Sequence, residues 1–226
     1  MINLPKSTAV NRSVPKEKFY SKTGVNTKLR QLFTDEIEKI TWANKIAPDT
    51  LNITAKDYAE LQVFEIALKG TSLSPTVLKH IDTFIPYPIL FILKQSGASK
   101  AVISFKEPTA KSVDKMKVDS YYETSWQKDL TLEIKGRSVD EIYKHFLFQI
   151  EPHLQHDKQA NTRTTIEQNK ERVVLQKQIE ALNKQISTEP SIGKRQELAR
   201  ERHELEHKKN VTIEPKNISL TEAGDK

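Results

Sequence analysis

The sequence predicts an α+β domain in which a mixed or antiparallel sheet packs against helices, followed by a C-terminal helical hairpin or coiled-coil appendage. Three segments predict the sheet: Leu61–Lys69 alternates, Ile89–Leu93 is a continuous apolar run, and Ala101–Phe105 follows a polar turn that contains glycine. The appendage is predicted from composition, because the chain becomes polar and charged after Pro152. This order of strands and helices is typical of the α+β class.

Helices are expected on both sides of the first of these strands. Apolar residues from Leu32 to Ile46 recur at helical spacing, which predicts a helix over about Thr34–Lys45. The pair Ser74-Pro75 predicts a second helix over Pro75–Phe84, because proline suits the first helical position. A short strand is expected between the two, at Leu51–Thr54.

The rest of the globular part is expected to hold a loop, a strand and a helix. Glu107–Asp119 is polar and lysine-rich, which favours a loop, whereas Leu130–Ile134 alternates like a strand. Ser138 and Glu141 have the spacing of a capping box, which predicts a helix that reaches about Ile150.

The predicted organisation has five parts: a basic N-terminal arm (1–31), an α+β domain (32–152), a linker (153–165), a helical hairpin or coiled coil (166–210) and a disordered tail (211–226). Apolar residues of the helical part follow heptad spacing over only about two heptads, fewer than the three or four of a self-sufficient coiled coil. They are therefore expected to need a partner surface, which is the protein's own domain, a second copy or another subunit. These partner-binding candidates are Leu175, Ile179, Leu182, Ile186, Leu198 and Leu205.

Positive charge is concentrated at the start of the chain. Residues 1–30 contain seven cations and a single anion, so they carry the whole formal net charge of +6. A basic segment beside a neutral body is suited to contact a phosphate backbone, and the alternative is a solvated terminus that aids solubility. The candidate nucleic-acid-binding cations are Lys6, Arg12, Lys16, Lys18, Lys22, Lys28 and Arg30.

An aromatic cluster of Tyr121, Tyr122 and Trp126 lies near several lysines. Such rings stack on bases while lysines contact phosphates, and the alternative is ordinary packing beside a solvated loop. Trp126 is therefore added to the nucleic-acid-binding candidates.

The sequence contains no recognisable catalytic motif, and no cofactor, metal site or catalytic residue is predicted. There is no cysteine, which excludes disulfides and thiolate metal sites, and no phosphate-binding glycine loop. His203 and His207 have the spacing of a zinc pair, but a solvated helix face is the better explanation. No signal peptide or membrane-spanning segment is recognised, so a soluble, cytoplasmic protein is expected.

A magnesium-dependent nuclease is the main enzymatic alternative. Such a site needs carboxylates that hold the metal and a lysine that assists the attacking water. The nearest match to an acid and a lysine two residues apart is Glu133-Ile134-Lys135, with Asp129 close by. The non-functional alternative is the exposed polar face of an antiparallel sheet. Further candidates are Glu36 or Glu38, Asp49 or Asp57, and Glu65 with Lys69.

Several short segments of residues 1–150 are similar to one bacterial family. They are Leu4-Pro5-Lys6, Val14-Pro15-Lys16, Phe19-Tyr20, Ile40-Thr41-Trp42-Ala43-Asn44-Lys45-Ile46, Ile85-Pro86-Tyr87-Pro88-Ile89-Leu90-Phe91, Tyr122-Glu123-Thr124-Ser125-Trp126 and Gly136-Arg137-Ser138-Val139-Asp140. Together they resemble DUF4391, a domain of unknown function. The resemblance implies a gene position beside helicases and DNA methyltransferases, and it transfers no catalytic residue. The helical extension lies outside the matched segments.

These observations favour a non-catalytic accessory subunit of a phage-defence or restriction-modification-like complex. Its expected partners are the DNA backbone, a helicase or DNA methyltransferase subunit and, through the C-terminal helices, a second copy. The alternatives are a magnesium-dependent nuclease and a structural adaptor without nucleic-acid contact.

Overall fold

The computed structural model describes residues 4–21, 25–109, 112–155 and 162–213. The chain divides into two compact units, residues 1–152 and 153–226, and each is described by itself. Within the described residues, no helix combines the length and the apolar character needed to cross a membrane.

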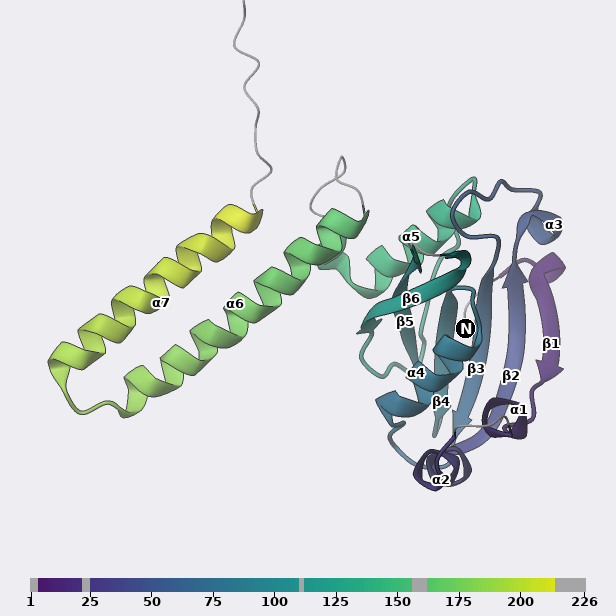
Figure 1. Ribbon diagram of the computed structural model, residues 1–226, viewed down its shortest axis with the longest axis horizontal. Coiled ribbons are helices and arrows are strands. Elements are labelled where there is room, and N and C mark those ends of the chain that lie inside the picture. Colours follow the sequence, from purple (N-terminus) through teal and green to yellow (C-terminus); the bar gives the residue numbers. More distant parts are fainter. Residues whose placement is uncertain (1–3, 22–24, 110–111, 156–161, 214–226) are drawn as a thin grey trace, which may run out of the picture. The chain divides into compact units, whose positions relative to one another are not determined.

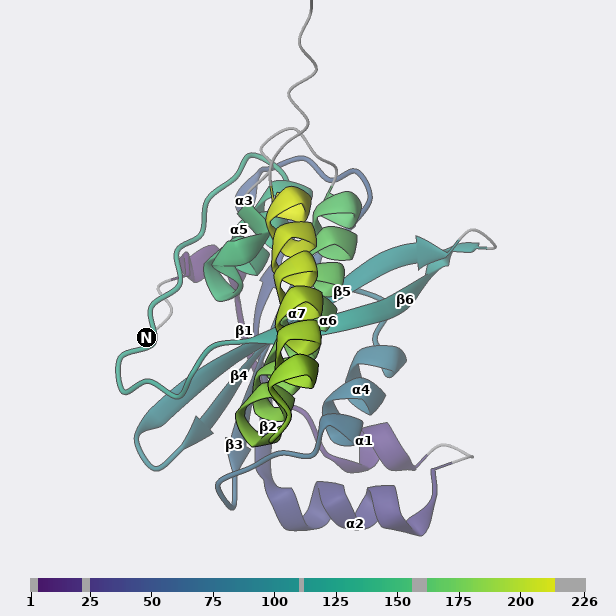
Figure 2. The ribbon, with the colours of Figure 1, turned by 90° about the vertical axis from the view of Figure 1, so that its left-hand side faces the viewer.

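The first unit is built on a six-stranded sheet with the strand order β1-β2-β3-β4-β5-β6 (Figures 1 and 2). The pair β3 and β4 is parallel and the other pairs are antiparallel, so the predicted mixed sheet of an α+β fold is confirmed. The strands are β1 (Ala9–Ser13), β2 (Ile37–Ile46), β3 (Leu61–Leu68), β4 (Ile89–Gln95), β5 (Ala98–Thr109) and β6 (Ser112–Glu123).

Helices cover both faces of this sheet. In Figures 1 and 2, α1, α2 and α4 lie on one face and α5 lies on the other. The helix α4 connects β3 to β4, as a parallel pair requires. The bounds are α1 (Glu17–Tyr20), α2 (Thr27–Glu36), α3 (Pro48–Leu51), α4 (Pro75–Phe84) and α5 (Val139–Ile150), with short 3-10 turns η1 (Lys6–Thr8) and η2 (Pro152–Gln155).

The helix predicted over Thr34–Lys45 is wrong, because most of that segment is strand β2. The register with β3 shifts twice, between Ile37 and Lys39 and between Trp42 and Asn44. Each bulge adds a residue and reverses the alternation of faces. The buried residues of β2 therefore recur every third position, which resembles helical spacing; they are Ile37, Ile40, Ala43 and Ile46.

Three other segments differ from their predictions. Pro48–Leu51 is the helix α3, and only Thr54 of the predicted strand Leu51–Thr54 forms a β-bridge. The described residues of the predicted loop Glu107–Asp119, 107–109 and 112–119, belong instead to the paired strands β5 and β6, in which Glu107 stands opposite Lys117. Opposite charges directly across a pair of strands stabilise the pair, so a polar, lysine-rich segment can still form strands.

The predicted strand Leu130–Ile134 is wrong, because this segment has no regular secondary structure. Its backbone is instead held by α5, because the Gln149 amide accepts a hydrogen bond from Glu133 N and donates one to Glu133 O, both at 2.8 Å. Leu130 and Leu132 are buried, which explains the alternation in the sequence. By contrast, the predictions for β3, α4 and α5 are confirmed, and the Ser138 hydroxyl caps α5 at Glu141 N.

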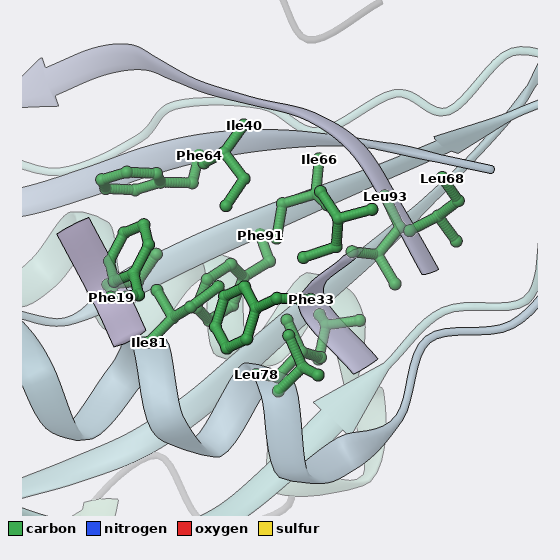
Figure 3. Packing of buried hydrophobic residues seen from close by; sticks show 14 residues of the cluster. Phe19, Phe33, Ile40, Phe64, Ile66, Leu68, Leu78, Ile81, Phe91 and Leu93 are labelled. Carbon is green, nitrogen blue, oxygen red and sulfur yellow. The ribbon is translucent and has the colours of Figure 1, made fainter. Parts of the chain in front are cut away.

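One core lies between the sheet and the helices α1, α2 and α4 (Figure 3). Phe33 of α2 and Ile81 of α4 are fully buried there and pack toward Phe91 of β4. Burial of a side chain of this size contributes about 1.5–3 kcal/mol. The residues labelled in the figure are Phe19, Phe33, Ile40, Phe64, Ile66, Leu68, Leu78, Ile81, Phe91 and Leu93.

The second unit contains the predicted helical hairpin. Its helices are α6 (Thr162–Thr188) and α7 (Ile192–Ile213), joined by Glu189-Pro190-Ser191. Polar contacts tie the two helices together, such as that between Lys209 Nζ and Gln176 Oε1 at 2.7 Å. Of the predicted tail, residues 211–213 are helical and 214–226 lie outside the described residues.

Candidate functional site

Aromatic packing holds α1 against α2. Phe19 of α1 stacks on Phe33 of α2 with ring centroids 6.0 Å apart, and Tyr20 meets the edge of Phe33 at 5.6 Å. The Asn26 side chain accepts a hydrogen bond from Leu29 N and so caps α2. The N-terminal part of the chain is thus folded onto the domain, and its polar side chains project outward.

Three cations of this pair are exposed: Lys18, Lys28 and Arg30, which we call the α1–α2 basic surface. Lys18 and Lys28 form no ion pair with any other described residue, whereas the Arg30 guanidinium lies 5.4 Å from the centroid of the Tyr20 ring. Lys16 is half-buried and donates to Ile37 O at 2.8 Å, so its ammonium is engaged in the fold.

The remaining predicted cations lie elsewhere. Lys6 belongs to η1 before β1, and Arg12 lies on β1 opposite Trp42. Five residues of β1 separate η1 from the end that leads to α1, which corresponds to roughly 17 Å. The six of these cations that the structure describes therefore do not converge on one spot, and Lys22 lies outside the described residues.

A buried ion pair lies at the C-terminal end of α4. Lys106 of β5 and Asp82 of α4 are 0 % and 1 % exposed, and Lys106 Nζ is 2.8 Å from Asp82 Oδ1. The same ammonium lies 2.7 Å from each of three carbonyl oxygens, those of Asp82, Ile85 and Tyr87. Carbonyls at the end of a helix lack partners within it, so Lys106 acts as a C-cap from a neighbouring strand.

Three tyrosines surround this pair. Tyr121 donates to Asp82 Oδ2 at 2.8 Å, Tyr143 donates to Ser104 O at 2.5 Å, and Tyr58 donates to Lys106 O at 2.6 Å. Burial raises the pKa of all three phenols, and the Asp82 carboxylate raises that of Tyr121 further. Burial also lowers the pKa of Lys106, which the Asp82 carboxylate opposes. The network connects α4, β5, β6 and α5.

A cavity of about 350 Å³ lies between the N-terminal half of α4 and the strands β4 to β6. Trp126 lines it, and Lys100 Nζ is 6.0 Å from the centroid of the Trp126 ring. Lys100 also forms an ion pair with Glu123 at 2.6 Å. The lining consists of Thr71, Ser72, Leu73, Pro75, Leu78, Leu93, Lys100, Val102, Tyr121, Glu123 and Trp126.

The predicted nuclease residues do not assemble into one centre. Glu65 pairs with Lys94 at 2.7 Å, and Glu36 accepts from Ser74 N at 2.6 Å, which positions the start of α4. Glu133 and Lys135 are exposed on the irregular segment before α5. The described part of the chain has no group of three or more His, Asp or Glu side chains arranged to hold a metal.

One of the further nuclease candidates, Asp49, belongs to a charged cluster whose other members, Lys45 and Glu60, are not among the candidates predicted from the sequence. Lys45 Nζ is 2.8 Å from Asp49 Oδ2 and 3.7 Å from Glu60 Oε2, and Gln62 Nε2 also donates to Glu60. Asp49 raises the pKa of Lys45, and Lys45 lowers that of Asp49. The sequence places Asp49 four residues after Lys45, but Glu60 joins them only through the pairing of β2 with β3.

Three of the six predicted partner-binding residues are buried in the hairpin. Leu175, Ile179 and Leu182 are buried, because α7 runs along α6. Ile186, Leu198 and Leu205 are half-buried. Apolar side chains that remain exposed on α6 are Val173 and Val174, at 41 % and 54 %.

A family model described as a domain of unknown function (DUF4391) matches residues 2–208. The match includes α6 and most of α7, which corrects the expectation that the resemblance ends near residue 150. No curated protein and no solved structure matches the chain. Since the family model spans most of its length, the chain belongs to the DUF4391 family.

Proposed function

We propose that the protein is a non-catalytic accessory subunit of a phage-defence or restriction-modification-like complex. It contacts nucleic-acid backbone through the α1–α2 basic surface and a helicase or DNA methyltransferase subunit through the hairpin. The observation that carries the nucleic-acid part is the exposure of Lys18, Lys28 and Arg30 without a carboxylate partner among the described residues.

Physical chemistry favours phosphate as the ligand of this surface. The net charge of residues 1–30 equals that of the whole chain, so the rest of the protein is neutral and does not repel a polyanion. Each lysine or arginine that meets a phosphate releases counterions, and the logarithm of the affinity then falls with the logarithm of salt by about 0.9 per contact. Salt dependence therefore measures how many cations take part.

Charge reversal of the α1–α2 basic surface tests the proposal. The triple variant Lys18→Glu, Lys28→Glu, Arg30→Glu is expected to abolish measurable binding of a duplex at low salt, followed by fluorescence anisotropy. The matched control reverses three exposed hairpin lysines, Lys177, Lys184 and Lys194, and changes the net charge equally. Equal loss in both variants would show that the effect comes from net charge and not from a specific surface. Unchanged binding in the first variant would show that the α1–α2 basic surface is not the contact.

The partner contact is tested separately. A tagged full-length chain is expected to co-purify a helicase or methyltransferase from its host, and the variant Val173→Glu, Val174→Glu is expected to lose that partner. Capture that persists in this variant rejects the exposed face of α6 as the contact. If capture is lost only there while no duplex is ever bound, the protein is a structural adaptor.

A magnesium-dependent nuclease is the second candidate, and the cluster of Lys45, Asp49 and Glu60 favours it. Two carboxylates beside an ammonium are the groups that metal-assisted phosphodiester hydrolysis uses. Plasmid nicking by purified protein with Mg²⁺ or Mn²⁺, lost in Asp49→Asn and retained in Glu133→Ala, would establish the nuclease and reject the non-catalytic proposal. Absence of nicking in native protein rejects the nuclease.

A further inference from the structure

We infer that the cavity between α4 and the strands β4 to β6 takes one unstacked nucleobase of a single strand. The inference rests on the proposed nucleic-acid contact. It adds a second site, which binds a base instead of the phosphate backbone. A base outside a stack needs a pocket with an aromatic or apolar wall for its faces and polar groups for its edge. The cavity provides both.

The wall is aliphatic and aromatic. Three buried aliphatic residues line the cavity: Leu78 of α4, Leu93 of β4 and Val102 of β5. Leu78 and Leu93 are labelled in Figure 3. Tyr121 and Trp126 add two rings. The cavity, at about 350 Å³, lies at the lower end of the range of small-ligand pockets, roughly 300–1,000 Å³.

The polar groups are concentrated in three elements. Lys100 offers a donor and Glu123 an acceptor, held 2.6 Å apart with side-chain exposures of 17 % and 59 %. Thr71 and Ser72 add hydroxyls from the loop before α4. A base presents both donors and acceptors on its edge, so a fixed ammonium–carboxylate pair matches it better than an aliphatic side chain.

The Tyr121 hydroxyl does not donate a hydrogen bond to a ligand in the cavity, because another group already accepts its proton. This hydroxyl donates to Asp82 Oδ2 at 2.8 Å, and Asp82 is paired with the buried Lys106. This hydrogen bond holds the phenol of Tyr121, which lines the cavity, in place. Stacking on fixed rings tolerates every base, so the site selects an unpaired base rather than a sequence.

The cavity and the α1–α2 basic surface belong to neighbouring elements. The C-terminal residue of α2, Glu36, accepts a hydrogen bond from Ser74 N at the start of α4. The ten residues of α2 span about 15 Å, so its basic N-terminal turn and the start of α4 are about one short helix apart. A single strand of a few nucleotides can reach both.

Trp126 fluorescence provides the test. The variant Trp42→Phe leaves Trp126 as the sole tryptophan of the full chain. A short oligodeoxynucleotide is expected to quench this signal and to bind about 5- to 150-fold more tightly than an abasic strand with the same phosphates. Addition of Leu73→Phe, which fills the cavity, is expected to remove that difference and leave salt-dependent binding unchanged.

The outcomes separate this inference from the proposed function. Equal affinity for the normal and abasic strands, without quenching, overturns the base site and leaves the backbone contact intact. If neither a duplex nor a single strand binds, the proposed nucleic-acid contact fails, whereas binding of the duplex alone overturns only the base site. Quenching by free AMP without quenching by any strand would assign the cavity to a mononucleotide. The Lys18→Glu, Lys28→Glu, Arg30→Glu variant should lose binding of the strand, because its backbone contact is removed. Free AMP should still quench Trp126 in this variant, and Leu73→Phe should abolish that quenching.

Discussion

Lys106 is a residue whose burial cannot be predicted from the sequence around it. In the sequence it stands where an apolar strand gives way to a polar segment, so it is expected at a solvated boundary. In the fold it is fully buried and bonded to α4. No local signal encodes this, because its carbonyl partners lie 19 to 24 residues earlier in the chain.

Replacement of Lys106 by methionine should be among the most destabilising changes. It leaves the Asp82 carboxylate buried without its cation and three carbonyls without a donor, at a cost of about 3–5 kcal/mol. Urea unfolding followed by tryptophan fluorescence measures this. The double variant Lys106→Met, Asp82→Asn should recover part of the loss, since it removes the uncompensated charge. A double variant less stable than the single one would contradict the ion-pair explanation.

The buried phenols predict a loss of stability at alkaline pH. Their folded pKa values lie above 10.0, so above pH 10 the unfolded chain loses protons that the folded chain keeps, and the free energy of unfolding falls. Lys106 has the opposite effect below pH 10.5: its folded pKa is lowered, so the folded chain loses this proton first and the free energy of unfolding rises with pH. Urea curves at increasing pH above 10.5 should therefore show the decline, and Tyr121→Phe should make it shallower. An equal slope in that variant would show that Tyr121 titrates alike in both states.

At the scale of single elements, the sequence predicts well where packing follows one period and poorly where it changes. Helix α4 follows one helical spacing, strand β3 is buried over most of its length, and both are predicted nearly to the residue. Strand β2 changes phase at two bulges that only its pairing with β3 reveals. Leu130–Ile134 alternates correctly, but its backbone partner is the side chain of Gln149, which no periodicity indicates.

Gly136 gives a prediction at the entry to α5. Its φ is +149°, and an added Cβ would lie 2.8 Å from Glu141 Cβ and 2.9 Å from Ile142 N, within the first turn of the helix. Gly136→Ala should therefore cost about 1–3 kcal/mol in urea unfolding. Gly193→Ala serves as the control: an added Cβ there meets nothing within 4 Å, and alanine favours a helix by up to about 1 kcal/mol. If the two substitutions change the free energy of unfolding equally, the backbone near Gly136 has shifted to make room for the added Cβ.

For the whole molecule, the sequence predicts the uneven charge and the hairpin but not the candidate sites. The excess of cations in residues 1–30 is visible in composition. That three of them share the α1–α2 pair depends on Phe19 reaching Phe33. The cavity is assembled from the loop before α4, α4 itself, three strands and Trp126, so its existence depends on the sheet order β4-β5-β6.

The division into two compact units predicts two unfolding transitions. Both tryptophans, Trp42 and Trp126, belong to the first unit, so their fluorescence follows that unit alone, whereas far-ultraviolet circular dichroism also follows α6 and α7. The hairpin has a narrow apolar seam and should melt at lower urea, since most helical stability comes from packing. Leu182→Asp places a charge in that seam, where Leu182 is 8 % exposed, and should lower the helical transition while the fluorescence transition stays in place. The exposed Lys184→Asp change in the same helix is the control. If both probes report one transition that Leu182→Asp shifts equally, the units fold as one, and the hairpin is an integral part of the domain that carries the cavity.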